Sequence, residues 1–222
     1  MYKSPEIVVI HEFLSECETQ TIISSAQPSL QRIYFGRNGK VDAVNSIHKR
    51  LAVGSRHLER HNKLMPTISR RICAITGLNM EVTEPSNVAN DYYGKALSKY
   101  TFRKYSVGGY FEPHFDRFAK LNPNATYVYG RIATWLNYLS DVGAGGATVF
   151  PLINVTVWPT KYSALFWHNF DKSGEPDWQT LHSGCPVLVG HKWIATKGIH
   201  FMGNEFRKPC NPYDRHSRLY IQ

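Results

Sequence analysis

The stretch RIATWLNYLSDVGAGGATVFP, residues 131–151, is the part of the sequence that decides the fold class. Its two runs of β-branched and aromatic residues, RIATWLNYL and ATVFP, are separated by glycine-rich sequence, which is typical of two short strands joined by a loop. Runs of the same kind occur before and after it, namely KYTFRKY (99–105), NVTVWP (154–159), YSALFWH (162–168) and CPVLVGHKWIA (185–195). Short strands at this spacing predict a β-sandwich or β-barrel for the chain beyond about residue 82.

The first third of the chain has a different, helix-rich pattern. The strand-like run EIVVI (6–10) precedes Ser15 and Glu18, a capping box that predicts the start of a helix of about ten residues. A second helix is predicted within residues 55–76, where Pro66 marks a start or a kink and Gly77 a stop. The apolar residues at near-helical spacing in that segment are Leu58, Leu64, Ile68, Ile72 and Ile75.

Length and composition are those of one globular domain. A chain of 222 residues with 42% hydrophobic content can bury a substantial core. We expect helix-rich support over residues 1–80, a β-rich core over 81–210 and a tail over 211–222. The polar stretches 36–50 and 117–130 are predicted to be exposed loops.

Charge and cysteine usage exclude several classes of protein. The net charge of +9 would suit nucleic acid or an acidic partner, but the basic residues are scattered, which favours an ordinary solvated surface. No apolar run reaches the roughly 18 residues that a membrane helix needs, and the first residues lack a signal-peptide pattern. The four cysteines have no CxxC spacing, which argues against a zinc site and a redox-active dithiol; they are Cys17, Cys73, Cys185 and Cys210.

The stretch GYFEPHFDR, residues 109–117, carries a candidate pair of metal ligands. In extended backbone, His114 and Asp116 would point to the same face and could reach one ion. A stable site needs a third ligand, and the downstream candidates are His168, His182, His191, His200 and His216. Two histidines and one carboxylate would occupy one face of an octahedral ion and leave positions open, which suits ferrous iron that binds an oxidant and a cosubstrate.

The residues around His182 favour it as the third ligand. It opens HSGCPVLVGHKW, an apolar stretch in which Lys192 follows ten residues later. A buried ammonium is costly without a partner. A keto dicarboxylate that chelates the metal at one end and pairs with Lys192 at the other would give both residues a task.

The segments YFEPHFDRF, RIATWLNYLSDVGAGGATVFP, ALFWHN, HSGCPVLVGHKWIATKGIH and EFRKPC together resemble the catalytic domain of prolyl 4-hydroxylases, in particular the α subunit of the collagen enzymes. The resemblance covers roughly residues 5–210. It implies a double-stranded β-helix, a jelly-roll barrel supported by helices, that uses Fe(II), 2-oxoglutarate, O2 and L-ascorbate and hydroxylates proline in a proline-rich or collagen-like peptide.

The resemblance also implies roles for individual residues. His114, Asp116 and His182 match the iron ligands, and Lys192 matches the base that holds the distal carboxylate of 2-oxoglutarate. Tyr105 and Thr148 match positions that bind or border the same cosubstrate, and Arg131 matches an arginine of the peptide groove.

Cys185 and Cys210 match a disulfide of the collagen-type enzymes. A disulfide implies an oxidising compartment, here the lumen of the endoplasmic reticulum. The collagen α subunits further imply a protein disulfide isomerase as partner subunit.

The sequence departs from the family pattern at two positions. Phe111 stands where the family usually has tyrosine, three residues before the first iron-ligand histidine. Gly198 stands where it usually has tryptophan, six residues after the lysine. Both changes bear on the peptide, because they remove a hydroxyl and an apolar wall next to it. The separate peptide-binding domain of the collagen α subunits also has no counterpart within these residues.

Three functions are compatible with these patterns. The first is the prolyl 4-hydroxylase, the second a related iron dioxygenase that acts on nucleic acid or another protein side chain, and the third a non-catalytic peptide-binding relative. The complete ligand set argues against the third. Four aromatic residues either form a dry wall around the metal or belong to the core: Phe111, Phe115, Trp135 and Trp193.

Overall fold

The computed structural model of the protein describes residues 2–3, 5–32, 52–58, 63–80, 99–116 and 130–208. The predicted loop at 36–50, all but the last residue of the predicted loop at 117–130, the tail at 211–222, and Cys210 lie outside the described residues. The strands are β1 (Tyr2–Lys3), β2 (Glu6–Ile10), β3 (Gln31–Arg32), β4 (Ala52–Leu58), β5 (Lys99–Tyr105), β6 (Phe111–His114), β7 (Arg131–Tyr138), β8 (Ala144–Gly145), β9 (Thr148–Phe150), β10 (Val155–Val157), β11 (Ala164–His168), β12 (His182–Gly184), β13 (Val187–Val189) and β14 (Lys192–His200). The helices are α1 (Glu16–Ala26) and α3 (Leu64–Thr76), with short 3-10 turns η1 (Gln27–Ser29), η4 (Pro151–Ile153) and η5 (Trp178–Thr180).

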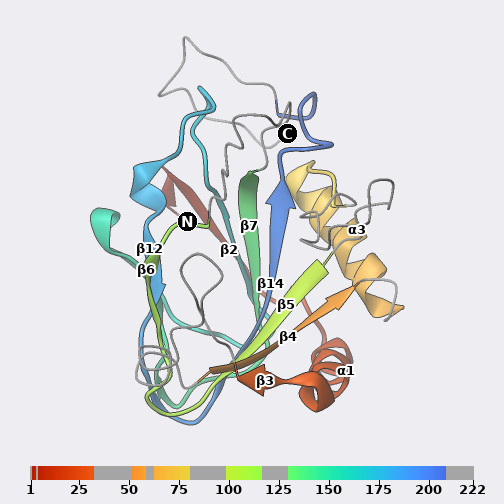
Figure 1. The fold of residues 1–222 in the computed structure, drawn as a ribbon, viewed down its shortest axis with the longest axis vertical. Helices are drawn as coiled ribbons and strands as arrows, with labels where there is room; N and C mark the ends of the chain where they lie inside the picture. The colour runs from red at the N-terminus through yellow and green to blue at the C-terminus, as the bar shows by residue number, and fades with distance from the viewer. Residues whose placement is uncertain are drawn as a thin grey trace.

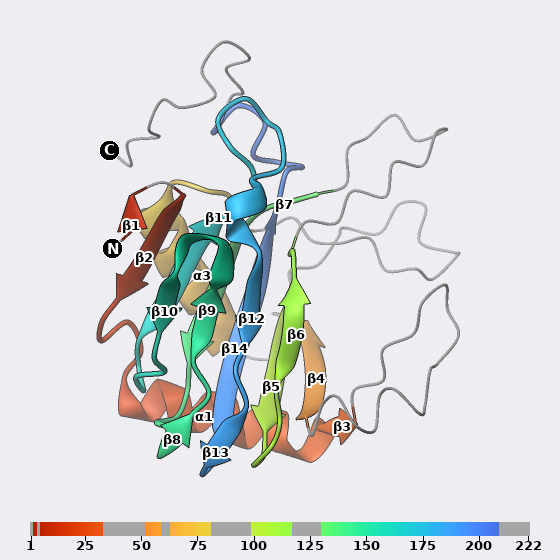
Figure 2. The ribbon, with the colours of Figure 1, turned by 90° about the vertical axis from the view of Figure 1, so that its left-hand side faces the viewer.

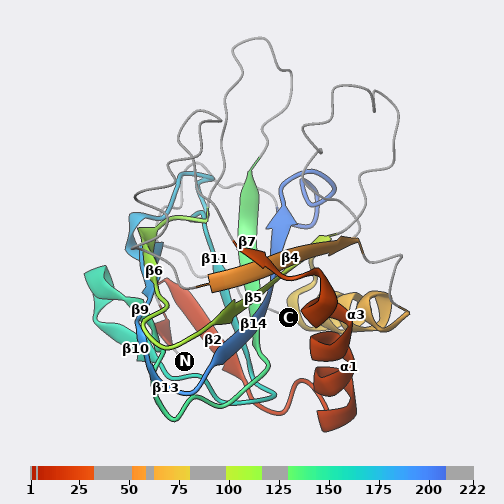
Figure 3. The same ribbon diagram turned by 60° about the horizontal axis from the view of Figure 1, so that its bottom comes forward.

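Two antiparallel sheets face each other. The larger has eight strands in the order β1-β2-β11-β7-β14-β5-β4-β3, and the smaller has four in the order β10-β9-β12-β6. Figure 2 shows the smaller sheet in front of the larger one, with the two-stranded β8–β13 sheet at its lower end. Helices α1 and α3 lie on the opposite side of the large sheet, as Figures 1 and 3 show from two directions.

Alternation along the central strands divides the apolar residues into two cores. In β7, Ala133 and Trp135 belong to the core on the helix side, whereas Leu136 and Tyr138 belong to the other core. The second core also takes residues from both sheets, such as Leu165 of β11 and Phe150 of β9, and therefore lies between the sheets. Because i and i+2 in a strand share a face, polar residues in register with Leu136 and Tyr138 also point between the sheets.

Most of the predicted elements are present. The β2 strand and the α1 helix with its Ser15–Glu18 capping box are confirmed, and each strand-like run contains at least one strand. The run CPVLVGHKWIA contains two, β13 and the start of β14, because Gly190 interrupts it at a φ of 87°. Among the described residues, no helix has the length and apolar character needed to cross a membrane.

The helix predicted within residues 55–76 is partly wrong. It begins only at Leu64, with Pro66 in its first turn and Gly77 as a left-handed C-cap, and residues 52–58 form β4 instead. Pairing with β5 along the whole length of β4, from Ala52 to Leu58, determines this conformation. A long-range pairing therefore overrides the helical spacing that Leu58 contributes to the sequence pattern.

Candidate metal centre

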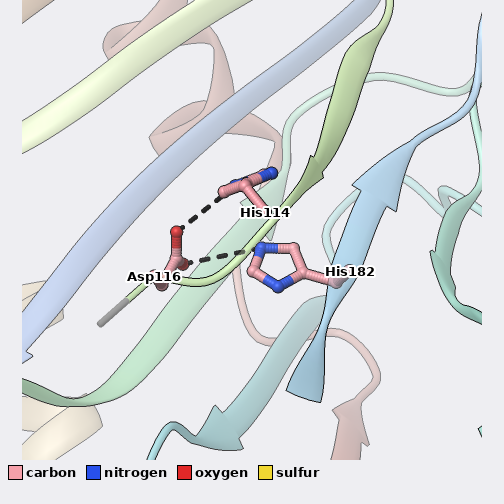
Figure 4. A group of neighbouring side chains, drawn as sticks. All are labelled: His114, Asp116 and His182. Atoms are coloured by element: carbon pink, nitrogen blue, oxygen red, sulfur yellow. Dashed lines mark ion pairs between the residues drawn. The ribbon is translucent and has the colours of Figure 1, made fainter. Parts of the chain in front are cut away.

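Three polar side chains converge where the edge of the small sheet meets the space between the sheets. His114 ends β6 and His182 begins β12, and the two residues are paired across these antiparallel strands. Asp116 follows β6 by two residues. As Figure 4 shows, the three side chains point toward one another, and their ligand atoms all lie within 4.8 Å of each other.

Backbone carbonyl groups fix the orientation of both imidazole rings. The Nδ1 of His114 lies 2.7 Å from the carbonyl oxygen of Glu112, and the Nδ1 of His182 lies 2.9 Å from that of Thr180. A carbonyl oxygen can only accept, so each Nδ1 carries the proton and donates it. The Nε2 of each ring is therefore the atom with a free lone pair, and both Nε2 atoms face Asp116.

The carboxylate of Asp116 is held from two sides. Its Oδ1 lies 3.4 Å from Nε2 of His114 and its Oδ2 lies 3.7 Å from Nε2 of His182. The hydroxyl of Thr134 donates to Oδ2 at 2.7 Å, and Nδ2 of Asn169 donates to that hydroxyl at 3.1 Å. The sequence analysis did not identify Thr134 or Asn169. Strand alternation would have pointed to Thr134 once the face of β7 that lies between the sheets was known.

Burial and mutual charge set the protonation states of the centre. Burial alone would raise the pKa of Asp116, but the nearby His182, His114 and Arg131 hold that pKa well below its usual range. Burial lowers the pKa of His182 to about 4. At neutral pH Asp116 is therefore a carboxylate and His182 a neutral imidazole, the forms in which both groups bind a cation.

These donors fit a divalent transition metal. Two imidazole nitrogens and one carboxylate, all from one edge of the site, can occupy one face of an octahedral ion and leave positions open to other ligands. The hydrogen bonds from both Nδ1 atoms and from Thr134 supply the outer support that metal ligands commonly have. The structure thus brings His114, Asp116 and His182 together, whereas His168 and His200 lie outside this group.

A second polar group lies between the sheets, around a buried lysine. Lys192 begins β14 and is only 4% exposed, and its Nζ donates to the hydroxyl of Thr148 at 3.3 Å. That hydroxyl also accepts from Tyr138 at 2.8 Å, and Nζ lies 5.6 Å from the centre of the Tyr138 ring. Among the described residues, no carboxylate forms an ion pair with Nζ, and burial lowers the pKa of Lys192 to about 8.

Two further residues lie beside the lysine, and one of them is on the strand of His182. Tyr105 of β5 is paired across the strands with Lys192 and belongs to the same core as Tyr138. Gly184 of β12 is paired with Thr148, and a Cβ on Gly184 would lie 3.9 Å from Nζ of Lys192. Because Gly184 follows His182 by two residues on one short strand, β12 places a residue of the candidate metal centre and a residue next to Lys192 side by side.

Tyr138 was also missed from the sequence, although it lies at the centre of the lysine group. Burial raises the pKa of its hydroxyl, so Tyr138 remains a neutral donor. In RIATWLNYL it is four residues beyond Thr134 and on the same face. Alternation could have identified it once the inward face of the strand was known.

The residues predicted to meet the peptide lie beside the metal centre. The ring of Phe111 stacks on His114 with centroids 3.7 Å apart, and the guanidinium of Arg103 lies 5.3 Å from the Phe111 centroid. Arg131 begins β7, and its charge acts on Asp116. Phe115 lies between two metal-site residues and meets Trp178 edge to face at 5.4 Å.

The alternative that Trp135 and Trp193 wall the metal is wrong. Both belong to the core on the helix side of the large sheet, where Trp135 packs against Phe13 with centroids 4.7 Å apart. Strand alternation explains the error, since Trp135 adjoins the inward-facing Thr134 and therefore points the other way. Of the four aromatic residues, only Phe111 and Phe115 lie next to the centre.

The predicted Cys185–Cys210 disulfide concerns a residue outside the described part of the chain. Cys185 is half-buried, and its backbone N–H donates to Ala147 at 2.8 Å. No disulfide joins Cys17, Cys73 or Cys185 to another described residue.

Comparison with known proteins gives a family and close relatives. Residues 100–200 match the family described as the 2OG-Fe(II) oxygenase superfamily. The chain is 40% identical over 212 residues to prolyl 4-hydroxylase subunit alpha-1 of Mus musculus, and the alignment covers 94% of this chain. It covers 37% of that subunit, so the chain spans little more than a third of the relative's length. The resemblance seen in the motifs is confirmed.

Two solved structures share the fold. The viral collagen prolyl hydroxylase of Paramecium Bursaria Chlorella virus-1, in its 2OG complex, aligns with a TM-score of 0.64 and 21% identity over 87% of this chain and 95% of that one. A prolyl hydroxylase of Trichoplax adhaerens, in complex with a hypoxia inducible factor peptide fragment, aligns with a TM-score of 0.56 and 17% identity over 94% and 89%. With the two facing sheets, these likenesses confirm the predicted double-stranded β-helix.

Proposed function

The chain belongs to the 2OG-Fe(II) oxygenase superfamily, and on that premise we propose that it hydroxylates peptidyl proline at C4 while 2-oxoglutarate is oxidised to succinate and CO2. One observation carries the proposal. A three-residue metal centre and a buried lysine share one space between the sheets, with β12 common to both. A keto dicarboxylate would use both groups: its keto-acid end would chelate the metal, and its distal carboxylate would pair with the lysine.

Different residues would bind the metal and the cosubstrate. His114, Asp116 and His182 would hold Fe(II), which when bound supplies the activation of O2 and of the keto acid. Lys192 pairs with the distal carboxylate of 2-oxoglutarate, and the hydroxyl of Thr148 lies within reach of the same group. Tyr105 is buried directly across from Lys192, and its hydroxyl would help to bind 2-oxoglutarate at this end of the site.

The substrate that we propose is a proline-containing peptide of collagen-like composition. Arg131 and Phe111 would meet it, because both lie next to the metal centre. Relatives of the chain are named prolyl 4-hydroxylases, and one solved neighbour is named a collagen prolyl hydroxylase. L-ascorbate would keep the iron in its ferrous form between turnovers.

The cellular setting follows from the same family. We propose that the protein works in the lumen of the endoplasmic reticulum, with Cys185 and Cys210 joined in a disulfide and with a protein disulfide isomerase as a second subunit. Non-reducing peptide mapping by mass spectrometry tests the disulfide, and a Cys185–Cys210 cross-linked peptide is the expected product. Co-purification of the isomerase from an expressing cell tests the partner.

The test of the activity is a reconstituted reaction. The protein is incubated with Fe(II), ascorbate, 2-oxoglutarate and a panel of proline-rich peptides, and mass spectrometry is expected to find one added oxygen on proline. Succinate without any hydroxylated peptide would point to another substrate, such as nucleic acid or a different side chain. Absence of iron-dependent succinate would favour the non-catalytic relative.

A further inference from the structure

A glycine in β14 leaves the space in which the side chain of Arg131 lies. A Cβ built on Gly198 would be 2.6 Å from Cδ and 2.7 Å from Nε of Arg131, closer than Cβ atoms approach other atoms. Gly198 is not among the residues with positive φ, so its backbone conformation does not require glycine. What requires it is the arginine that crosses over it.

A β-bulge in β7 turns Arg131 toward this space. Ile199 is paired with Ala133, and His200 with Arg131, so that Ile132 has no partner in the ladder. Ile132 and Ala133 both belong to the core on the helix side. The extra residue reverses the alternation, and Arg131 therefore shares the inward face with Thr134 instead of pointing to the helices.

The same arrangement holds Arg131 beside the metal centre. Gly198 is paired with Thr134, whose hydroxyl donates to Asp116 at 2.7 Å. Nδ2 of Asn169 donates both to the carbonyl of Arg131 at 3.0 Å and to the hydroxyl of Thr134 at 3.1 Å. The strand that carries Arg131 is thus tied to the carboxylate of the centre. The bulge sets the face on which the Arg131 side chain lies, and Gly198 leaves room for that side chain against β14.

We propose that Gly198 is a positioning residue that sets peptide recognition through Arg131. Without a Cβ at position 198, the stem of Arg131 lies flat against β14, and its guanidinium is presented to the main-chain carbonyl oxygens of a bound peptide. A proline-rich peptide in the polyproline II conformation has no internal hydrogen bonds, so its carbonyls need such donors. This inference rests on the proposed function, because it concerns the peptide of that reaction.

The test is a double-mutant cycle on Gly198→Ala and Arg131→Ala. Peptide KM is measured in turnover, and peptide Kd is measured without O2 in the presence of Mn(II) and 2-oxoglutarate, so that binding is read even where turnover is absent. Gly198→Ala is expected to weaken peptide binding by about tenfold, the scale of a lost hydrogen bond to a charged group. The KM for 2-oxoglutarate should stay within twofold, and Gly198→Trp should have the larger effect on the peptide.

The second arm of the cycle separates this inference from a loss of packing. In the Arg131→Ala background, Gly198→Ala is expected to have no further effect on peptide binding. Gly143→Ala is the matched control, since a Cβ there would come within 2.9 Å of the Val189 side chain, away from the metal centre. An undiminished effect of Gly198→Ala without the arginine, or unchanged peptide binding in the single variant, would overturn the inference. If the wild type forms no hydroxyproline, but the effects of Gly198→Ala and Arg131→Ala on peptide Kd still depend on each other, the proposed reaction is refuted and this inference is not.

Discussion

We propose that Thr134 supports the candidate metal centre without being a ligand, and its replacement tests this support separately from ligation. Thr134→Val keeps the shape of the side chain but removes the hydrogen bond to Oδ2 of Asp116. Lost outer-shell partners typically cost about 10–100-fold in metal affinity. We therefore expect weaker Mn(II) binding by calorimetry, with turnover restored at saturating Fe(II).

His182→Ala should abolish turnover at any Fe(II) concentration; near-normal activity in that variant would refute the ligand assignment.

If Lys192 binds 2-oxoglutarate as proposed, that binding should depend on pH. Burial lowers its pKa to about 8, so the free site loses its ammonium as the pH rises through that value. A bound dicarboxylate favours the charged form, and binding above pH 8 must therefore take up a proton. The KM for 2-oxoglutarate should be constant below about pH 8 and then rise toward tenfold per pH unit.

Lys192→Arg is the control for this pH dependence. Guanidinium keeps its charge over the whole range, so any KM that the arginine variant shows should not rise between pH 8 and 9.5. If the KM for 2-oxoglutarate rises with pH equally in the wild type and in Lys192→Arg, the pH dependence belongs to another group. Lys192→Ala should raise the KM at every pH.

The site residues that the sequence predicts are those with a local signal. His114 and Asp116 are two positions apart, and Lys192 is a charge inside an apolar run. Thr134, Asn169 and Tyr138 have no such local signal, because hydroxyl and amide side chains are common in strands and loops, and their partners lie 10 to 35 residues away in the chain. The position of Arg131 over Gly198 depends on a bulge, and a single unpaired residue in a ladder leaves no mark in the hydropathy pattern.

At the scale of the elements, α1 contributes stability and stays remote from the chemistry. Ser15 accepts from the backbone N–H of Glu18, and Glu18 in turn binds Arg71 of α3, so one cap connects both helices. Ser15→Ala should cost about 1 kcal/mol. For a chain of this size that corresponds to a fall in Tm of roughly 2–4 °C. Since α1 lies across the large sheet from β6 and β12, which carry His114 and His182, the KM for the peptide and the KM for 2-oxoglutarate should be unchanged.

Ser15→Asp tests whether this effect comes from the cap. An aspartate also accepts from the N–H groups of a first helical turn, so its Tm should stay close to that of the wild type. Equal destabilisation by alanine and aspartate would mean that Ser15 acts through packing. A calorimetric scan of the three proteins decides between these outcomes.

Element type was predictable where local signals and tertiary contacts agree. The capping box at Ser15 and the left-handed Gly77 mark helix ends by backbone chemistry alone, and both are present. Segment 52–58 shows the opposite case, since its partner β5 begins about 40 residues later in the chain. Gly190 likewise divides an apolar run into two strands that periodicity alone reads as one.

At the scale of the whole molecule, the order of the strands was not predictable from one sequence. β2 pairs with β11, so Ile7 and Trp167 are opposite each other although they are far apart in the chain. Such long-range pairings determine how the two sheets face each other. The sequence pattern alone restricts the fold class only to a sandwich or a barrel. The specific topology was expected from the resemblance to a known family, and the solved neighbours confirm it.

The position of the site between the sheets predicts that its ligands stabilise the whole fold. His114 and His182 belong to the small sheet and Lys192 to the large one, so a chelated 2-oxoglutarate would join the two sheets. Ligands that bind only the folded state at about 100 times their Kd add about 2.7 kcal/mol. With Mn(II) present, 2-oxoglutarate should therefore raise the Tm by roughly 5–10 °C. The shift should be absent with EDTA and in His182→Ala, and reduced in Lys192→Ala at the same ligand concentration. Equal shifts in EDTA would show that the dicarboxylate binds elsewhere, because in the proposed site its chelating end requires a metal held by His114, Asp116 and His182.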